Sequence, residues 1–256
     1  MAEPSAKWRE RLLYLISPIG LLLVWQILVE LGFGDRRFIP TPSDIALRFW
    51  QLSVSGELAT NTLATLWRVA AGFVIGVVPA VAIGLVMAMF RPVRIFFDPL
   101  IAALFPIPKV ALMPLLLLAF GFGDASKIAL VAIGVFFPVI VNTYAGAANI
   151  EKIYWDVSRN YGASLWVMFS RIVFFGALPM IFAGLRIAVA VAFIVLVAAE
   201  FVSTKVGIGY MIWNSWELLQ VDSMFVIVVI GILGLVASAL LAEPEHKVVP
   251  WRSDAN

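Results

Sequence analysis

Three ionisable side chains lie inside apolar stretches of the sequence, and they are the first candidates for chemistry. They are Lys109, Arg186 and Glu200. A charge at bilayer depth costs at least a few kcal/mol unless it faces protein or water, so each needs a partner or a water-filled cavity. Polar groups so placed are typical of a route for a polar solute. We therefore treat all three as candidates for a translocation pathway.

Lys109 is the strongest of these candidates, because it follows Pro106 and Pro108. These prolines free backbone carbonyls, which are tolerated at membrane depth only beside a cavity or another helix. In a cavity the ammonium group would attract an anion and offer hydrogen-bond donors. The alternative is that Lys109 pairs with Glu200 or with the freed carbonyls. For Arg186 and Glu200, near opposite ends of one apolar stretch, membrane anchoring or a structural ion pair is favoured over a pathway role.

Motifs for catalysis and metal binding are missing from the sequence. There is no G-x-x-x-x-G-K-[ST] phosphate loop, no H-E-x-x-H and no G-x-S-x-G, and the one histidine, His246, lies in the polar tail. The tetrapeptide GFGD, at 32–35 and 121–124, could suggest an intramembrane aspartyl protease. Both copies follow apolar stretches, where glycine simply ends a helix. The sequence therefore predicts no catalytic residue, no metal site and no cofactor in this chain.

The composition predicts an integral membrane protein. Hydrophobic residues make up 62% of the 256 positions and charged residues 13%, whereas a soluble domain carries about 25% charged residues. The cations are spread over the flanks of apolar stretches, which excludes a nucleic-acid-binding patch despite the net charge of +2. Cysteine is absent, so disulfides are excluded.

The apolar stretches predict one all-α transmembrane domain over residues 1–256. Its six spans are expected at 12–31, 61–90, 99–120, 127–148, 178–204 and 224–241. The first stretch is too long for a signal-peptide core and is expected to be a retained span. Ser43 is expected to cap a short amphipathic helix before the second span. A stripe of small residues in that span (Gly72, Gly76, Ala80 and Gly84) would let another helix approach closely.

The distribution of cations orients the spans. With the N-terminus inside, ten lysines and arginines fall on the inner side and four on the outer side, namely Arg36, Arg37, Arg48 and Lys205. Arg68 and Lys127 lie at span edges and would raise the outer count to six. Short cytoplasmic loops carry the excess of such residues, so both termini are expected in the cytoplasm.

The polar interval from Glu151 to Ile172 lies between the fourth and fifth spans, on the cytoplasmic side. Its apolar residues are spaced three and four apart, which predicts helix with one apolar stripe: Tyr154, Val157, Tyr161, Leu165, Met168 and Ile172. Gly162 interrupts the pattern and lets the backbone bend. We expect two short helical pieces that meet at Gly162, either as a partner-binding loop or as a plain surface connector.

Several segments make the chain resemble permease subunits of bacterial ATP-binding-cassette importers of the nitrate/sulfonate/taurine type. They include FIPTPSDI, LWRVAAGFVIG, FDPLIAALFPIPKVALMPLLLLAFGFGDASKIAL and ALPMIFAGLRIA. Such permeases carry EAA, three residues, glycine, nine residues and I-x-L-P in one cytoplasmic loop. In this chain Asp156, Gly162 and Ile172 match the acidic residue, the glycine and the isoleucine of that pattern. Two positions depart from it: Asp156-Val157-Ser158 stands in place of EAA, and Phe174-Phe175 stands in place of the L-P after Ile172. A second Leu-Pro pair, Leu178-Pro179, is intact.

The resemblance implies the type I importer permease fold, with a cytoplasmic coupling helix between the fourth and fifth spans. It also implies a pore formed by two copies of the chain in the bacterial cytoplasmic membrane, in contact with lipid. A cytosolic ATPase dimer would bind ATP and Mg²⁺, and a substrate-binding protein would deliver the solute from outside. On this interpretation the loop contacts the ATPase through Tyr154, Asp156, Val157, Arg159, Asn160, Tyr161, Gly162, Ala163, Ser164 and Leu165. The pathway residues are Pro106, Pro108, Lys109, Arg186 and Glu200.

Two other classes of protein stay open from the residues alone. An ion-coupled secondary transporter would also have helix breaks and polar groups at mid-membrane, although it often carries more intramembrane carboxylates than the single Glu200. A membrane enzyme would need a constellation of acid, base and nucleophile, which is missing. The resemblance suggests a small anion such as a sulfonate, nitrate or bicarbonate as substrate, and the sequence does not discriminate among them.

Overall fold

The structure is a computed structural model that describes the backbone of residues 4–248, and their side chains from residue 17 on except at 246 and 247. Within this range all regular elements are helices, and no strand is present. The elements in chain order are α1 (Pro4–Glu30), α2 (Pro42–Val54), α3 (Glu57–Met89), α4 (Arg91–Leu104), η1 (Lys109–Leu112), α5 (Met113–Phe120), α6 (Asp124–Ala148), α7 (Lys152–Asn160), α8 (Leu165–Val167), η2 (Met168–Val173), α9 (Phe174–Ser203), α10 (Ile208–Glu217), α11 (Val221–Met224) and α12 (Ile227–Val248). The predicted all-helical class is confirmed.

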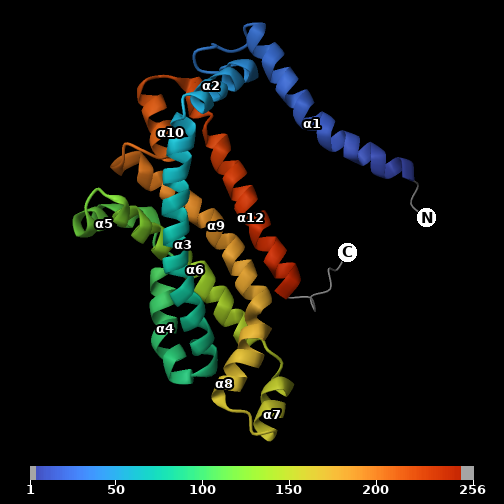
Figure 1. The fold of residues 1–256 in the computed structure, drawn as a ribbon, viewed down its shortest axis with the longest axis vertical. Coiled ribbons are helices and arrows are strands. Elements are labelled where there is room, and N and C mark those ends of the chain that lie inside the picture. Colours follow the sequence, from blue (N-terminus) through green and yellow to red (C-terminus); the bar gives the residue numbers. More distant parts are fainter. Residues whose placement is uncertain (1–3, 249–256) are drawn as a thin grey trace.

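The core consists of α3, α6 and α9, which pack along one another through most of the molecule (Figure 1). Leu130, Val135 and Leu196 are completely buried between them. The small-residue stripe of α3 faces α6: a Cβ at Gly72 would lie 2.6 Å from Cβ of Val131. One helix of the same chain therefore occupies this stripe, and the stripe does not call for a second copy of the protein.

The other elements gather at the two ends of this core. Figure 1 places α2 and α10 at one end, which we call the α2 end, and α7 with α8 at the opposite end, which we call the α7 end.

Four segments are long and apolar enough to cross a membrane: 57–89, 124–148, 165–203 and 221–245. The bent pair of α4 with η1–α5 makes a fifth when the pair is counted as one span, and residues Ser17–Glu30 of α1 form a shorter apolar helix.

The third predicted span, 99–120, is not one straight helix. The helix α4 already begins at Arg91, and the chain turns by 93° between Leu104 and Lys109. Pro106 and Pro108 lie in this turn and lack the N–H groups that would bond to the carbonyls of residues four positions earlier. The prolines thus divide the expected span into two segments.

The cap of α2 also differs from the expectation. Thr41, not Ser43, precedes the helix, and its hydroxyl accepts a hydrogen bond from N–H of Asp44, while the Asp44 carboxylate accepts from N–H of Thr41. Pro42 occupies the first helical position, where its missing N–H has no cost. This reciprocal arrangement needs an acidic residue three positions after the cap. Asp44 lies three positions after Thr41, whereas Ala46 lies three positions after Ser43.

Candidate functional site

The loop between α6 and α9 forms the tip of the α7 end, and it has the predicted shape. The helix α7 ends at Asn160, and Gly162 adopts a φ of +65°, which side-chain-bearing residues rarely adopt. The N–H of Ala163 donates to the carbonyl of Ser158, and that of Gly162 to the carbonyl of Arg159, closing a Schellman turn. Ser164 then caps α8 by accepting from N–H of Val167. The prediction of two short helices meeting at Gly162 is confirmed.

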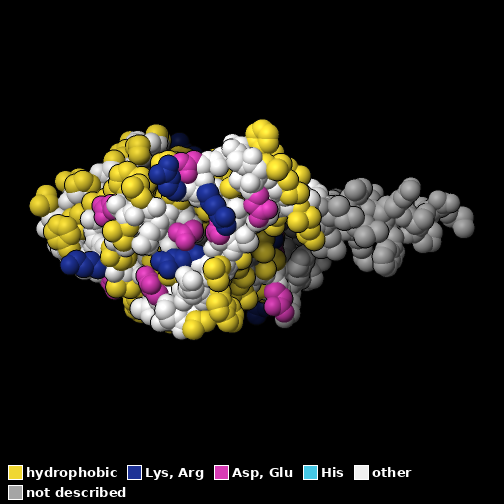
Figure 2. Space-filling view, turned by 90° about the horizontal axis from the view of Figure 1, so that it is seen from above, with side chains coloured by type: hydrophobic (Ala, Val, Ile, Leu, Met, Phe, Trp, Pro, Cys, Tyr) yellow, Lys and Arg dark blue, Asp and Glu magenta, His cyan; other side chains and the backbone are white. Residues whose placement is uncertain are grey.

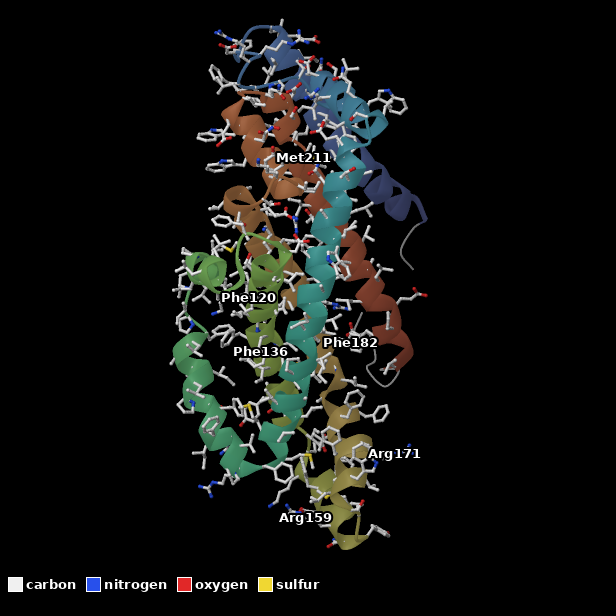
Figure 3. The ribbon with its side chains drawn as sticks, turned by 60° about the vertical axis from the view of Figure 1, so that its left-hand side comes forward. Phe120, Phe136, Arg159, Arg171, Phe182 and Met211 are labelled. Carbon is white, nitrogen blue, oxygen red and sulfur yellow. The ribbon has the colours of Figure 1, made fainter. Side chains whose placement is uncertain are left out.

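Most of the residues predicted to contact a partner lie on the surface of this tip. Tyr161 is 85% exposed and Leu165 63% exposed, and Tyr154 and Val157 are exposed beside them. The polar members Asp156, Arg159, Asn160 and Ser164 are exposed as well, whereas Ala163 is half-buried. Figure 3 shows Arg159 at the tip. Trp166, which the sequence reasoning did not select, adds another large exposed aromatic side chain.

The rest of the predicted apolar stripe points the other way and attaches the tip to the core. Met168 is buried and Ile172 is half-buried. Trp155 and Phe169 pack against the buried cluster around Val173 and Ala177. The segment η2 has π-helical hydrogen bonding and joins α8 directly to α9. The tip is therefore continuous with a core helix.

The ammonium group of Lys109 lies in the turn between α4 and η1. Its Nζ donates to the carbonyl oxygens of Leu104, Phe105 and Ile107 at 2.8, 3.0 and 2.9 Å, and lies 4.2 Å from the centre of the Phe137 ring. Leu104 would normally bond to N–H of residue 108, which is a proline. Lys109 thus binds the carbonyls released by the break, which is the alternative that the sequence left open, and does not pair with Glu200.

Arg186 pairs with a residue that sequence reasoning did not connect to it. Its Nη2 donates to the carboxylate of Glu245, so that the pair joins α9 to α12. The Arg186 side chain is 46% exposed and that of Glu245 is 8% exposed. This is a structural ion pair of the kind that the sequence favoured for Arg186.

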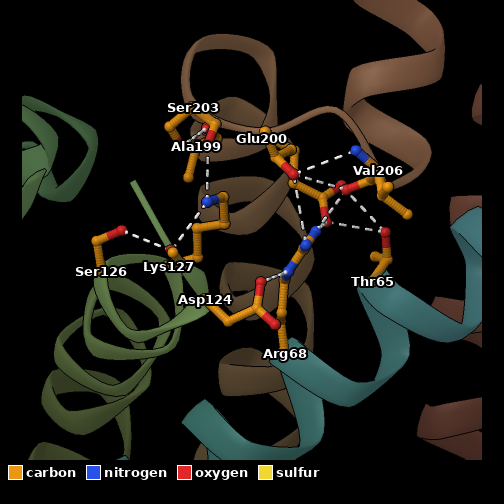
Figure 4. Close-up of polar contacts among 12 residues, drawn as sticks. Thr65, Arg68, Asp124, Ser126, Lys127, Ala199, Glu200, Ser203 and Val206 are labelled. Atoms are coloured by element: carbon orange, nitrogen blue, oxygen red, sulfur yellow. Dashed lines mark hydrogen bonds and ion pairs between the residues drawn. The ribbon is translucent and has the colours of Figure 1, made fainter. Parts of the chain in front are cut away.

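Glu200 lies at the centre of a buried polar cluster between α3, α9 and the turn to α10 (Figure 4). Its carboxylate accepts from Nη1 of Arg68 at 2.6 Å, from the hydroxyl of Thr65 at 3.0 Å and from N–H of Gly209 at 2.9 Å. The carboxylate is completely buried. A buried carboxylate is stable only when its lone pairs are occupied, and here α3 and the start of α10 contribute the donors to a carboxylate of α9.

The turn from α9 to α10 is shaped around this carboxylate. Gly207 has a φ of +139°, and a Cβ at this position would overlap the Glu200 carboxylate. Its N–H donates to the side chain of Asn61 at 2.7 Å, and N–H of Ile208 donates to the hydroxyl of Thr65 at 2.9 Å. The backbone of the turn is thus satisfied by side chains of α3.

Two charged residues of α6 extend the cluster. Asp124 accepts from Nε of Arg68 at 2.8 Å. Lys127 is buried, and its Nζ donates to the carbonyls of Phe122, Gly123 and Ser203. The sequence placed Arg68 and Lys127 at span edges and did not select either of them. A signal was present, because Arg68 and Glu200 are opposite charges inside two apolar spans, but nothing local indicated that those spans are neighbours.

Among the described residues no group of three or more histidine, aspartate or glutamate side chains could hold a metal ion. The features described above are the exposed tip around Gly162, the apolar segment that is broken at Pro106 and Pro108, and the buried polar cluster around Glu200. These features provide contact surfaces and fixed helix positions.

Comparisons with known proteins give a consistent assignment. Residues 80–243 match the family model for the binding-protein-dependent transport system inner membrane component. The chain is 37% identical to the aliphatic sulfonates transport permease protein SsuC of Escherichia coli K12, over 98% of this chain and 96% of that protein. It is 31% identical to the nitrate import permease protein NrtB of Synechocystis, over 90% and 86%. It is 28% identical to the taurine transport system permease protein TauC of Escherichia coli K12, over 91% and 87%.

Proposed function

The chain belongs to the family of binding-protein-dependent transport system inner membrane components, and from this premise we propose how its parts divide the work of import. It is a permease subunit of an ATP-binding-cassette importer and a multi-pass protein of the bacterial inner membrane. A separate ATPase and a substrate-binding protein complete the importer. The secondary transporter and the membrane enzyme are thereby set aside.

We propose that the chain crosses the membrane six times, with the α7 end in the cytoplasm and the α2 end outside. The four apolar segments and the bent pair supply five crossings, and α1 supplies the sixth. The excess of lysine and arginine on the α7 side supports this orientation.

The exposed tip around Gly162 is the observation that carries the proposed coupling role. Tyr154, Val157, Tyr161 and Leu165 expose apolar surface at a place that the proposed topology puts in the cytoplasm, where only a protein partner could cover it. Asp156 and Arg159 add charges beside that surface. The ATPase subunit docks here, and its movement reaches α9 through the continuous segment α8–η2.

The bend between α4 and η1 is proposed to line the pathway. Non-helical backbone at membrane depth is tolerated only against protein or water, and Pro106 and Pro108 are exposed in the single chain. The positive charge of Lys109 then lies beside the route of the solute. Glu200 and Arg186 act on the pathway indirectly, through the positions of the helices that they join.

Two copies of the chain are proposed to enclose this pathway. One chain leaves the apolar faces of α5 and of the bend uncovered: Leu118 is 86% exposed, and Leu115 and Phe120 are exposed beside it. A two-fold axis along the membrane normal would bring the two bends together.

The solute is proposed to be a small anion of the sulfonate class. This rests on the names of the relatives, two of which are named for the transport of aliphatic sulfonates and of taurine, with nitrate and bicarbonate as alternatives.

The test is purification of the tagged chain in mild detergent from its own source, followed by reconstitution with the ATPase and binding protein. We expect the ATPase to copurify, and sulfonate uptake to require ATP, the binding protein and this chain. Binding of other anions by the partner binding protein separates the substrate candidates. Uptake that proceeds without ATP and is driven by an ion gradient would overturn the proposal.

A further inference from the structure

A polar groove of about 410 Å³ opens at the α2 end, between α2 and the segment that joins α10 to α11. Three arginines line it, Arg36, Arg37 and Arg48, against two carboxylates, Asp44 and Asp222. Figure 2 views the molecule from this end and shows basic and acidic side chains gathered on the face. The sequence places only four cations outside, so three of the four line one groove.

Arg48 donates to three neutral acceptors, and the carboxylate of Asp222 also lines the groove. Its Nε donates to the hydroxyl of Ser223 at 2.7 Å, its Nη1 to the Gln51 amide oxygen and its Nη2 to the Gln220 amide oxygen, both at 3.3 Å. All three acceptors are neutral, and within the described part of the chain no acidic side chain forms an ion pair with Arg48. The half-buried guanidinium is thus held in one orientation from both walls of the groove.

Arg36 and Arg37 are also held in place, but by carboxylates. Arg36 donates from Nε and Nη2 to Asp44, and Arg37 from the same two atoms to Asp35. Neither Nη1 group makes a hydrogen bond to another described residue, and the two side chains are 63% and 84% exposed. Each arginine therefore presents an edge of N–H donors toward solvent.

We propose that this groove is where the substrate-binding protein docks, with a carboxylate side chain of that protein seated on Arg48 and flanked by Arg36 and Arg37. A guanidinium fork matches a carboxylate in shape and charge, and an orientation fixed beforehand reduces the entropy lost on binding. The inference rests on the proposed function, which places the α2 end outside. Arg36 and Arg37 are each paired with one carboxylate, so the guanidinium of Arg48, which has only neutral hydrogen-bond acceptors, is the group that fits a carboxylate of an acidic protein surface.

The experiment uses the complete transporter, permease with its ATPase, in lipid nanodiscs, and measures Kd and kon for the cognate binding protein at low and high salt. Arg48→Gln is expected to weaken binding by about tenfold at low salt, with a smaller difference at high salt, because the charge attraction is screened there. Arg37→Gln removes an exposed arginine that contributes little to folding, and it is expected to lower kon. Lys205→Gln removes the outer cation that does not line the groove, and it serves as the matched control.

Three outcomes decide the matter. Weaker binding by Arg48→Gln and Arg37→Gln, with Lys205→Gln unchanged and all variants assembling with the ATPase, supports the groove. A Kd within about twofold of the unmodified transporter for both groove variants overturns it. A transporter that binds no binding protein even without substitution contradicts the proposed function instead, so the two failures are distinguishable.

Discussion

The Nη1 atom of Arg68 lies 2.6 Å from Oε1 of Glu200, and these two side chains are 6% and 0% exposed. They are 132 residues apart in the chain and connect α3 to α9. Thr65 and Gly209 also donate to Glu200, and Arg68 also donates to Asp124, to the carbonyl of Val206 and to the hydroxyl of Thr204. Removal of Arg68 leaves the Glu200 carboxylate buried without its ion-pair partner, and removal of Glu200 leaves Arg68 with only the half-exposed Asp124; either loss costs more than loss of both charges. This connection fixes α3, α9 and the start of α10 as one unit.

Glu200→Gln is expected to destabilise the protein by about 3 kcal/mol, because Arg68 loses its buried counter-charge. Arg68→Met should have a similar effect. The double variant Arg68→Met with Glu200→Gln is expected to cost less than the sum of the two single changes, since neither charge of the pair is left without the other. Thermal unfolding of the reconstituted complex measures all three. Additive effects would contradict a direct coupling between the two side chains.

Gly207→Ala is expected to disrupt the turn into α10. The residue has a φ of +139°, and the added methyl group would overlap the Glu200 carboxylate. A strained backbone of this kind costs of order 1–3 kcal/mol before the overlap is counted. Gly231→Ala in α12 meets no atom within 4 Å and is the control. Equal melting temperatures for the two variants would show that the turn is not constrained as described.

Asp156→Lys, Arg159→Glu and Gly162→Val are expected to uncouple ATP hydrolysis from transport while the protein still inserts into the membrane. The first two changes reverse charges on the exposed tip, and removal of one side of a charged hydrogen bond at an interface costs about 2–5 kcal/mol when its partner stays buried. The third forces valine into a φ of +65°. Copurification of the ATPase and substrate-stimulated hydrolysis are the measurements. Glu57→Lys, a charge reversal at the opposite end, should leave both unchanged.

Lys109→Met is expected to slow uptake, because it removes a positive charge beside the proposed pathway and releases three carbonyls at the bend. Lys109→Arg can still donate to those carbonyls and should keep a good part of the rate. The amount of assembled complex and its basal ATP hydrolysis are measured in parallel. Loss of complex in the Met variant would assign a structural role to Lys109, and unchanged uptake would discard the pathway role.

Acid pH is expected to weaken the attachment of the segment before α2. Hydrogen bonds from Arg36, then from Thr41, hold the pKa of Asp44 well below its ordinary value of 3.8. A carboxyl with a lowered pKa stabilises the fold above its ordinary pKa, and this contribution is lost as the pH falls below that value. Asp44→Asn should therefore lose less stability than the unmodified protein between about pH 5 and about pH 3. The difference should be small, because Arg36 is largely exposed.

The sequence alone determined those features that depend on neighbouring residues. Composition and long apolar stretches define a helical membrane protein. The three- and four-residue spacing around Gly162 predicts the bent tip, because helix periodicity and a left-handed glycine are local properties. Pro106 and Pro108 mark the break, although their spacing did not reveal that α4 and α5 meet at 93°.

Only the tertiary structure decided which distant groups meet. Arg68 binds Glu200 rather than solvent, and Arg186 binds Glu245, because helix packing brings together residues 132 and 59 positions apart. The small-residue stripe of α3 is covered by α6, which is likewise a contact between segments that are distant in the sequence. The charge of a side chain can be read from the sequence, but whether it is exposed, paired or enclosed depends on which helices pack beside it, and the local pattern does not contain that information.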